Sequence, residues 1–349
     1  MRCLLAALQK LIGRQWQFWS IAVVILLPTN LIHAEDAATR LASEVSLKQE
    51  SGKVVVTIGG EIVATYVYAD SEIPRPYFAH VHGPGGVQLT RNFPPIEGQD
   101  ATDHDTMHPG IWMAFGDLNG TDIWRNKGRV VHQRFLQPPT GGIDHGSFAV
   151  ENRYETAGGQ PICQEDCRLT FLVRPLGYLL LWDSTFSSDG EFSFGDQEEM
   201  GLGVRMATSI AVTSNQGGRL VDSEGRNGAK EIWGKTADWC DYSGPSGDFH
   251  AGITLMPHPD NFRSCWWHAR DYGFVAANPF GRSAMGAGAP SKVIVRGDAP
   301  LRLRFGLMMY GDSRRRLADP SEAYRDYLKV LQSERREPKP AIHVKEMHP

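Results

Sequence analysis

The chain has 349 residues, with 36 Lys and Arg against 40 Asp and Glu and a formal net charge of −4. This mildly acidic balance argues against nucleic acid as a partner, because phosphate binding needs a basic footprint. The length suffices for one large domain or two smaller ones.

The first 34 residues have the pattern of a signal peptide. Arg2, Lys10 and Arg14 give a positively charged start, and residues 18–27 form an apolar run interrupted by one serine. The run is about half of the ~20 residues that a spanning helix needs, so we expect cleavage rather than an uncleaved anchor. Removing residues 1–34 takes away three basic residues and leaves a net charge of −7. The pattern predicts a secreted or periplasmic protein that has no contact with the membrane after cleavage.

Runs rich in β-branched and aromatic residues dominate from residue 43 onward, with turns between them and no alternation of strands with helices. Gly59-Gly60 between two such runs predicts a hairpin. Alternation of Leu301 and Leu303 with arginines predicts a half-buried strand. We therefore predict an all-β fold, a large antiparallel β-sandwich with one C-terminal helix. The predicted strands are 54–58, 62–68, 130–136, 167–173, 178–186, 252–256, 273–277, 292–295 and 301–310.

The C-terminal helix is predicted to begin at Asp319-Pro320, an N-cap followed by proline at the first helical position. An apolar stripe from Ala323 to Leu331 would pack it onto the sandwich. The predicted organisation is one domain over residues 43–333 and a disordered tail over residues 334–349. Four cysteines remain after signal cleavage, and an oxidising compartment favours disulfides or free buried thiols over a zinc site. They are Cys163, Cys167, Cys240 and Cys265.

Four of the twelve histidines cluster in and beside the longest irregular segment. His80 and His82 would share one face if the preceding strand continues through them. His104 and His108 lie within a short stretch that also contains Asp103. Imidazole and carboxylate groups of this kind can either transfer protons near neutral pH or bind a metal. The alternative is a loop in which they hydrogen-bond to the backbone.

Two later segments offer groups that could hold a sugar. Trp124 could stack on the CH face of a sugar, and Arg125 beside it could donate hydrogen bonds to hydroxyl groups. Glu199 and Arg205, six residues apart on one extended strand, would share a face. They could form an acid or base beside a hydroxyl clamp, or equally a structural ion pair.

A third segment runs from Trp266 to Gly281. Alternation along a strand places His268 and Arg270 on one face and Trp267 on the other. His268 is therefore a candidate proton-transfer group, with a structural hydrogen bond as the alternative. Asn278, just after the next predicted strand, is a candidate residue for binding the same sugar.

Motifs spread from Lys53 to Tyr310 carry a family resemblance. They resemble a bacterial family of uncharacterised secreted proteins, common in planctomycetes, which has carried the label methane oxygenase PmoA. The family is similar in architecture to the galactose mutarotase-like supersandwich, in which His and carboxylate residues on a concave sheet act on sugars. The motifs include Asp103-His104, His108-x-Gly110-Ile-Trp112, Gly116-Asp117-x-Asn119-Gly120, Glu199-x-Gly201, Trp267-His268-x-Arg270-x-Tyr272-Gly273 and Asn278-Pro-Phe-Gly281.

Our leading hypothesis from the sequence is a secreted carbohydrate-active protein, namely a sugar-directed hydrolase, lyase or epimerase. The sequence indicates no specific cofactor for it. Its acid–base groups would be His104, His108, His268 and Glu199. A carbohydrate or other small polar ligand would be held by Trp124, Arg125, Arg205, Arg270 and Asn278. One alternative is a copper or non-haem iron oxygenase whose divalent metal is bound by His80, His82, Asp103, His104 and His108. Another is a non-catalytic glycan-binding surface protein.

Overall fold

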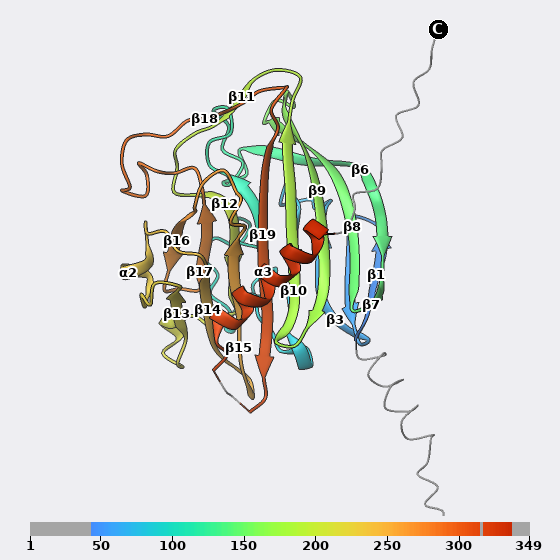
Figure 1. The fold of residues 1–349 in the computed structure, drawn as a ribbon, viewed down its shortest axis with the longest axis vertical. Helices are drawn as coiled ribbons and strands as arrows, with labels where there is room; N and C mark the ends of the chain where they lie inside the picture. The colour runs from blue at the N-terminus through green and yellow to red at the C-terminus, as the bar shows by residue number, and fades with distance from the viewer. Residues whose placement is uncertain (1–42, 315–316, 337–349) are drawn as a thin grey trace, which may run out of the picture. The chain divides into compact units, whose positions relative to one another are not determined.

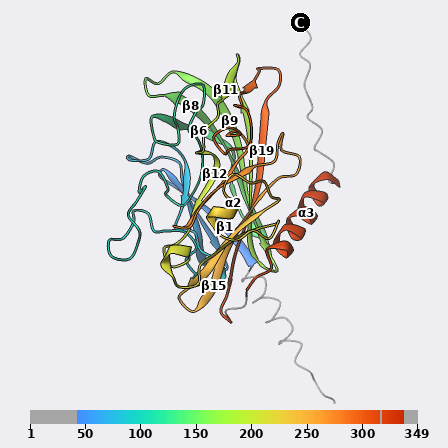
Figure 2. The same ribbon diagram turned by 90° about the vertical axis from the view of Figure 1, so that its left-hand side faces the viewer.

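The computed structural model describes residues 43–314 and 317–336. The strands of this part form two large sheets, paired antiparallel throughout, that face each other as the layers of a sandwich (Figure 1, Figure 2). A helix at the C-terminal end lies on the outer side of one sheet. The predicted all-β sandwich with one C-terminal helix is confirmed. The predicted signal peptide, residues 1–34, and residues 337–349 of the predicted tail lie outside the described residues.

One layer is a nine-stranded sheet. Its hairpin between β2 and β3 turns through Gly59 and Gly60, with φ of 61° and 84°, as the sequence predicts. The alternating Val54 and Val56 of β2 are buried in the core. In spatial order the strands are β16 (Trp266–Arg270), β17 (Phe274–Asn278), β12 (Met200–Arg205), β5 (Ile111–Phe115), β4 (Tyr77–Ala79), β3 (Glu61–Val67), β2 (Lys53–Ile58), β1 (Glu44–Glu50) and β7 (Gly142–Ile143).

The other layer is an eight-stranded sheet, and the described residues add one short ribbon and three short helical turns. The ribbon is β11 (Phe192–Phe194) with β18 (Val293–Val295), and the turns are η1 (Pro84–Gly86), η2 (Val212–Ser214) and α2 (Ala229–Ile232). The eight strands in spatial order are β13 (Arg219–Asp222), β14 (Cys240–Ser246), β15 (Phe249–Pro257), β19 (Leu301–Asp312), β10 (Gly177–Ser187), β9 (Pro161–Arg174), β8 (His145–Thr156) and β6 (Gly128–Thr140).

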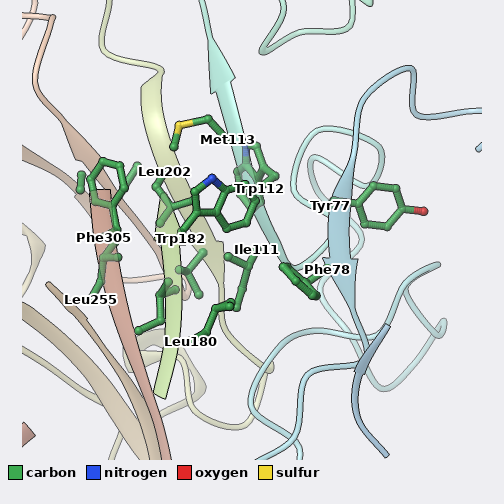
Figure 3. Close-up of a cluster of buried hydrophobic side chains, with 14 of the residues drawn as sticks. Tyr77, Phe78, Ile111, Trp112, Met113, Leu180, Trp182, Leu202, Leu255 and Phe305 are labelled. Carbon is green, nitrogen blue, oxygen red and sulfur yellow. The ribbon is translucent and has the colours of Figure 1, made fainter. Parts of the chain in front are cut away.

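The main core lies between the two sheets (Figure 3). Trp182 of β10 and Phe305 of β19 come from one sheet, and Met113 of β5 and Leu202 of β12 come from the other. All four are at most 3% exposed. Burial of each such side chain stabilises the fold by about 1.5–3 kcal/mol, so this contact fixes which face of the nine-stranded sheet points outward.

The helix α3 (Pro320–Arg336) covers the outer face of the eight-stranded sheet (Figure 2). The Asp319 carboxylate accepts a hydrogen bond from the Ser321 N–H at 2.9 Å, which is the predicted N-cap. Tyr327 is buried with Leu181 and Met308 of the sheet in a second apolar cluster. The predicted helix is confirmed and continues to Arg336. Among the described residues, no helix combines the length and apolar character needed to cross a membrane.

All four cysteines of the described part are free and buried. Burial raises the pKa of each thiol, which keeps it protonated and unreactive near neutral pH. Of the two outcomes that the sequence left open, the structure therefore shows free buried thiols rather than disulfides.

Candidate functional site

A pocket of about 360 Å³ lies on the outward face of the nine-stranded sheet. It contains all four residues predicted as acid–base groups and three of the five predicted ligand-binding residues. Because side chains alternate along β12, Gly203 and Arg205 point to this face while Leu202 and Val204 point into the core. The lining residues are His104, Met107, His108, Trp124, Arg125, Glu199, His268, Arg270, Tyr272 and Phe274.

Strand register brings these side chains together from distant parts of the sequence. Gly203 and Ala276 occupy the middle of one row, between Trp112 and His268, and the indole of Trp112 lies over Gly203. A Cβ at Gly203 would lie 2.7 Å from Cζ2 of Trp112, so only glycine fits beneath the indole. That row runs Trp112, Gly203, Ala276, His268 across β5, β12, β17 and β16, and the next row runs Arg205, Phe274, Arg270 across β12, β17 and β16.

Two tryptophans form an aromatic wall of the pocket. Trp112 and Trp124 are 0% and 1% exposed, with ring centroids 5.2 Å apart and planes at 66°. Trp124 lines the pocket, whereas Trp112 packs behind it and stacks on His108 at 4.9 Å. Trp124 thus borders the space that a ligand would occupy, but its ring is almost fully covered by its neighbours, so its sugar-stacking role stays a prediction.

The loop that carries His104 and His108 is held by a buried arginine. Arg91 is 1% exposed, and its guanidinium donates to the carbonyl oxygens of Ala101 (2.8 Å), Asp103 (2.6 Å), His104 (3.2 Å) and His108 (3.1 Å). Residues within this loop are thereby fixed although they form no strand or helix. Sequence reasoning did not assign Arg91 a role, since nothing local marks an arginine as the anchor of a loop ten or more residues away.

His104 is oriented by its neighbour. Its Nδ1 lies 2.8 Å from Oδ2 of Asp103, whose Oδ1 accepts a hydrogen bond from Nη2 of Arg205 at 2.6 Å. Although burial alone would raise it, these two hydrogen bonds hold the pKa of Asp103 below its usual value. The carboxylate therefore fixes the Nδ1–H tautomer of His104 and leaves Nε2 to exchange a proton with a ligand.

His108 is part of a stack of rings. It lies parallel to Phe274 at 4.7 Å and to His104 at 4.8 Å, and it is 4% exposed. Burial, with His104 and Arg205 nearby, lowers its pKa well below the usual value, so the ring is neutral. Neutral and sandwiched in this way, His108 supports the ring of His104.

His268 enters the same pocket from β16. Its Nδ1 lies 3.0 Å from the carbonyl oxygen of Glu198, and its Nε2 lies 3.6 Å from Oε2 of the same residue. Burial and the nearby Arg270 lower the pKa of His268 to about 3, even though the bond to the Glu198 carbonyl opposes this. At neutral pH the ring is therefore uncharged, and Nε2 is a proton acceptor.

Two ion pairs border the pocket beside His268. Nη2 of Arg125 lies 2.7 Å from Oε2 of Glu199, and Nη2 of Arg270 lies 3.1 Å from Oε2 of Glu198. The sequence left open an ion pair between Glu199 and Arg205, but Arg205 is bound to Asp103 instead. The reason is that Glu199 precedes β12 and that Gly201, near the start of this strand, has φ 99°, so residues 199 and 205 do not follow one regular strand.

Two predicted ligand-binding residues do not line the pocket. Asn278 is fully buried, and its amide donates to Gln197 O and Glu198 O and accepts from the N–H groups of Phe280 and Gly281. Its hydrogen-bonding capacity is thus used within the fold, and the predicted substrate contact is corrected to a structural role. Arg205 is 1% exposed and lies 4.5 Å from the ring of Tyr272, behind the lining.

Four pocket or near-pocket residues were not assigned by sequence reasoning. Tyr272 stood in a family motif, and Phe274 lies in the predicted strand 273–277, but only the register of β16 with β17 places it on the same face as His268. Met107 and Glu198 had no distinguishing signal, since each sits in an irregular segment beside a residue that was chosen.

The alternative metal-binding set is not assembled. Within residues 43–314 and 317–336, no three His, Cys, Asp or Glu side chains are grouped so that they could hold a metal ion. Strand β4 ends at Ala79, and His80 has a left-handed φ of 52°, so His80 and His82 do not share a strand face as expected. Nδ1 of His82 instead lies 2.8 Å from the carbonyl oxygen of His80. Neither residue lines the pocket with His104 and His108.

The lowered pKa of His268 predicts a pH dependence of stability. Between the ordinary value of 6.5 and about 3, the unfolded chain binds a proton at this ring that the folded chain does not. Stability is therefore fully present above pH 6.5 and falls as the pH falls toward about 3. His268→Gln should flatten this slope by at most about 1.4 kcal/mol per pH unit in urea unfolding. Equal slopes for this variant, the parent and a variant of the exposed His145 would contradict the expectation.

Comparison with protein families gives one match. Residues 53–319 match a model described as a family of unknown function, DUF6807. The chain belongs to this family. The matched residues include every residue that lines the pocket. The family description names no activity, so the methane-oxygenase label stays a prediction. Comparison with curated proteins gave no significant match.

The DUF6807 chain is also similar to solved structures. These include a galactose mutarotase-like protein from Lactobacillus casei ATCC 334 (12% identity, 76% of this chain and 100% of that chain, TM-score 0.33). A second, from Clostridium acetobutylicum, has 8% identity over 76% and 94% of the two chains and a TM-score of 0.36. A protein described as a kojibiose phosphorylase, from the human microbiome, has 8% identity and a TM-score of 0.35, and 87% of this chain covers 34% of its length. Values this low transfer neither an activity nor a substrate.

Proposed function

We propose that this chain is an exported, sugar-directed acid–base enzyme that catalyses epimerisation or β-elimination. The observation that carries the proposal is the meeting of His104, His268 and Glu199 in one pocket. Both reactions need one group to remove a proton from carbon and another to deliver a proton to carbon or to a leaving oxygen. Export rests on the signal-peptide pattern of residues 1–34.

The two histidines are prepared for complementary roles. Each is fixed through Nδ1, His104 by the Asp103 carboxylate and His268 by the Glu198 carbonyl, so each offers Nε2 to a ligand. His268 is uncharged because burial lowers its pKa, so Nε2 has a free lone pair for a proton, although the low pKa makes it a weak base in the unliganded protein. His104 donates through Nδ1 to the Asp103 carboxylate, which leaves its Nε2 as the group that we assign to deliver the proton. Fixed ring orientation removes the entropic cost of aligning both groups with one substrate.

The carboxylates favour these reactions over hydrolysis. Most glycoside hydrolases use a pair of carboxyl groups that flank the scissile bond. Among the described residues, Glu199 is the carboxylate that lines the pocket, and it is paired with Arg125 at 2.7 Å. Asp103 and Glu198 instead hold the rings of His104 and His268, respectively. The pocket thus lacks the pair of carboxylates that hydrolysis usually needs among the described residues, whereas two oriented histidines are present for proton transfer at carbon.

The rest of the lining suits a sugar. The half-buried Tyr272 presents aromatic surface for CH groups, with Trp124 and Phe274 packed at the pocket wall, and Arg125 and Arg270 present N–H donors for hydroxyl oxygens. A volume of about 360 Å³ falls within the range of small-ligand sites. One or two sugar residues, rather than the middle of a long polymer, would fit such a space.

Proton transfer at carbon can be tested directly. Incubation of the protein with neutral and acidic hexoses, and with their disaccharides, in D₂O should replace a C–H by C–D or yield an unsaturated product in at least one case. Proton NMR follows both outcomes. Glycan binding with neither outcome across the panel would favour the non-catalytic glycan-binding alternative. Turnover that requires an added metal ion and a stoichiometric metal lost in His104→Ala would favour the oxygenase alternative.

A further inference from the structure

Building on the acid–base function proposed above, we propose that the pocket selects a sugar that carries a carboxylate, a uronic acid residue, and that Arg270 anchors this carboxylate. The inference rests on the charge behind the pocket, on the weak pairing of Arg270, and on the position of Arg270 relative to His268. It names a substrate class and a specificity-determining residue.

Three buried arginines lie behind the pocket, and two of them pair with the same carboxylate, Asp103. Arg75, Arg91 and Arg205 are each at most 2% exposed. Arg75 donates to neutral groups, the Asn126 amide and the Met107 carbonyl, while Arg91 and Arg205 share Asp103. Burial lowers the pKa of Arg75 and of Arg91 only to about 10, so both stay charged at neutral pH.

The buried charge of Arg205 favours an anion in the pocket. Charges removed from water are screened weakly, and their field is felt over several ångströms. Nη1 of Arg205 is buried and has no acceptor among the described residues, while the same guanidinium lies 4.5 Å from the ring of Tyr272, which lines the pocket. Asp100 and Asp105 also attract Arg91, and Asp122 attracts Arg75, so Arg205, which forms its ion pair with Asp103, is the buried arginine that a negatively charged ligand would stabilise further.

Arg270 is the pocket arginine best able to bind that ligand. Its side-chain partner in the structure is Glu198 at 3.1 Å, and both side chains are 36% exposed. Ion pairs of this exposure contribute about 0–1 kcal/mol, so a ligand can displace Glu198 at little cost. Arg125, by contrast, is held by Glu199 at 2.7 Å and by Asp122 at 3.2 Å. The planar guanidinium of Arg270 can bind a carboxylate through two parallel hydrogen bonds.

The position of Arg270 then directs the chemistry. Arg270 and His268 lie two residues apart on one face of β16, a separation of about 7 Å along the strand. A carboxylate on Arg270 therefore brings the carbon bonded to it toward Nε2 of His268. The C–H bond next to a carboxylate becomes acidic once the carboxylate charge is neutralised, and this condition is what Arg270 supplies.

The reaction on a uronic acid residue balances as follows. Nε2 of His268 takes the proton from the carbon next to the carboxylate, and the electron pair of that C–H bond forms a C=C bond to the carboxyl carbon, giving an enediolate. Arg270 and the buried arginines stabilise the added negative charge. Protonated His104 then returns a proton to the opposite face of the carbon, which completes epimerisation. Alternatively the C–O bond at the next carbon breaks, its oxygen takes the proton from His104, and an unsaturated sugar leaves.

Calorimetric binding of matched sugars to the full chain tests the selection. Methyl glucuronide and methyl glucoside differ only at one carbon, as do methyl galacturonide and methyl galactoside. We expect at least one uronide to bind tenfold or more tightly than its neutral counterpart, with the preference falling as salt is raised. Arg270→Gln should remove that preference, and Arg270→Lys should restore part of it. Arg296→Gln, at an exposed arginine paired with Glu191, should bind like the parent.

The outcomes separate this inference from the proposed function. Equal binding of uronides and neutral glycosides, or an equal loss of both in Arg270→Gln, overturns the selection of a carboxylate. Tighter binding of glucose 6-phosphate than of glucuronate overturns it in favour of a phosphate. In either case C–H exchange on a neutral sugar in D₂O leaves the acid–base function standing. Uronide selection with neither C–H exchange nor an unsaturated product supports the inference about substrate and overturns the proposed catalysis.

Discussion

His268→Gln is expected to lower kcat by about 10²- to 10⁴-fold on the sugar whose C–H exchanges, because positioned general bases typically contribute this much. Glutamine keeps the size of the side chain and can still donate to the Glu198 carbonyl, but it has no basic nitrogen. KM should change little if His268 acts on the proton rather than on binding. The measurement is the steady-state rate of deuterium incorporation or of unsaturated product, with urea unfolding to show that the variant is folded.

A matched control lies outside the pocket. His250 on β15 is 8% exposed, nearly as buried as His268, and its two ring nitrogens have no partner among the described residues. His250→Gln should leave kcat within about twofold of the parent, because it does not border the substrate space. A His268→Gln enzyme with parental kcat would remove His268 from the proton-transfer step and leave His104 and Glu199 as the groups to test. A loss of activity equal in both variants would point to a general loss of structure.

The fold was predictable because its signals are local. Alternation in β2 and β19, the Gly59-Gly60 turn and the Asp319 cap each depend on neighbours within a few residues. Strand β8 was missed because its charged and polar residues alternate with few β-branched ones, so its apolar face is thin. Its burial comes from strands β6 and β9 on either side, which no local pattern reveals.

The pocket was predictable in part for the same reason. Alternation along β16 places His268 and Arg270 on one face, and the structure brings them to the pocket together. Alternation does not predict that the amide of Asn278, on the same face of the next strand, donates to the backbone of residues 197 and 198. Residue type and spacing indicate which face a side chain occupies, whereas its partner depends on which loop lies against that face.

The loop that carries His104 shows where sequence reasoning stops. The structure holds it through tertiary bonds from Arg91 and from Arg205, which are distant in sequence from most of the groups they bind. A histidine at the end of a strand and a histidine on such a loop look alike in sequence. His80 and His104 both have left-handed backbone angles, φ 52° and φ 50°, yet only His104 is brought to the pocket.

Arg91→Leu is expected to lower the free energy of unfolding by about 2–5 kcal/mol, because it removes a buried charge-assisted donor and leaves the loop carbonyls it binds without partners. Amide hydrogen exchange of residues 101–108 should accelerate more than exchange in the sheets, and kcat should fall with it because His104 loses its fixed position. Arg91→Lys should be intermediate, since one ammonium cannot reach four carbonyls. Arg134→Leu, at an exposed arginine paired with Glu151, should leave the free energy of unfolding in urea nearly unchanged. Equal losses in the free energy of unfolding for Arg91→Leu and Arg134→Leu would show that the turns of the loop hold it without Arg91. His104 would then reach its position in the pocket only when substrate binds.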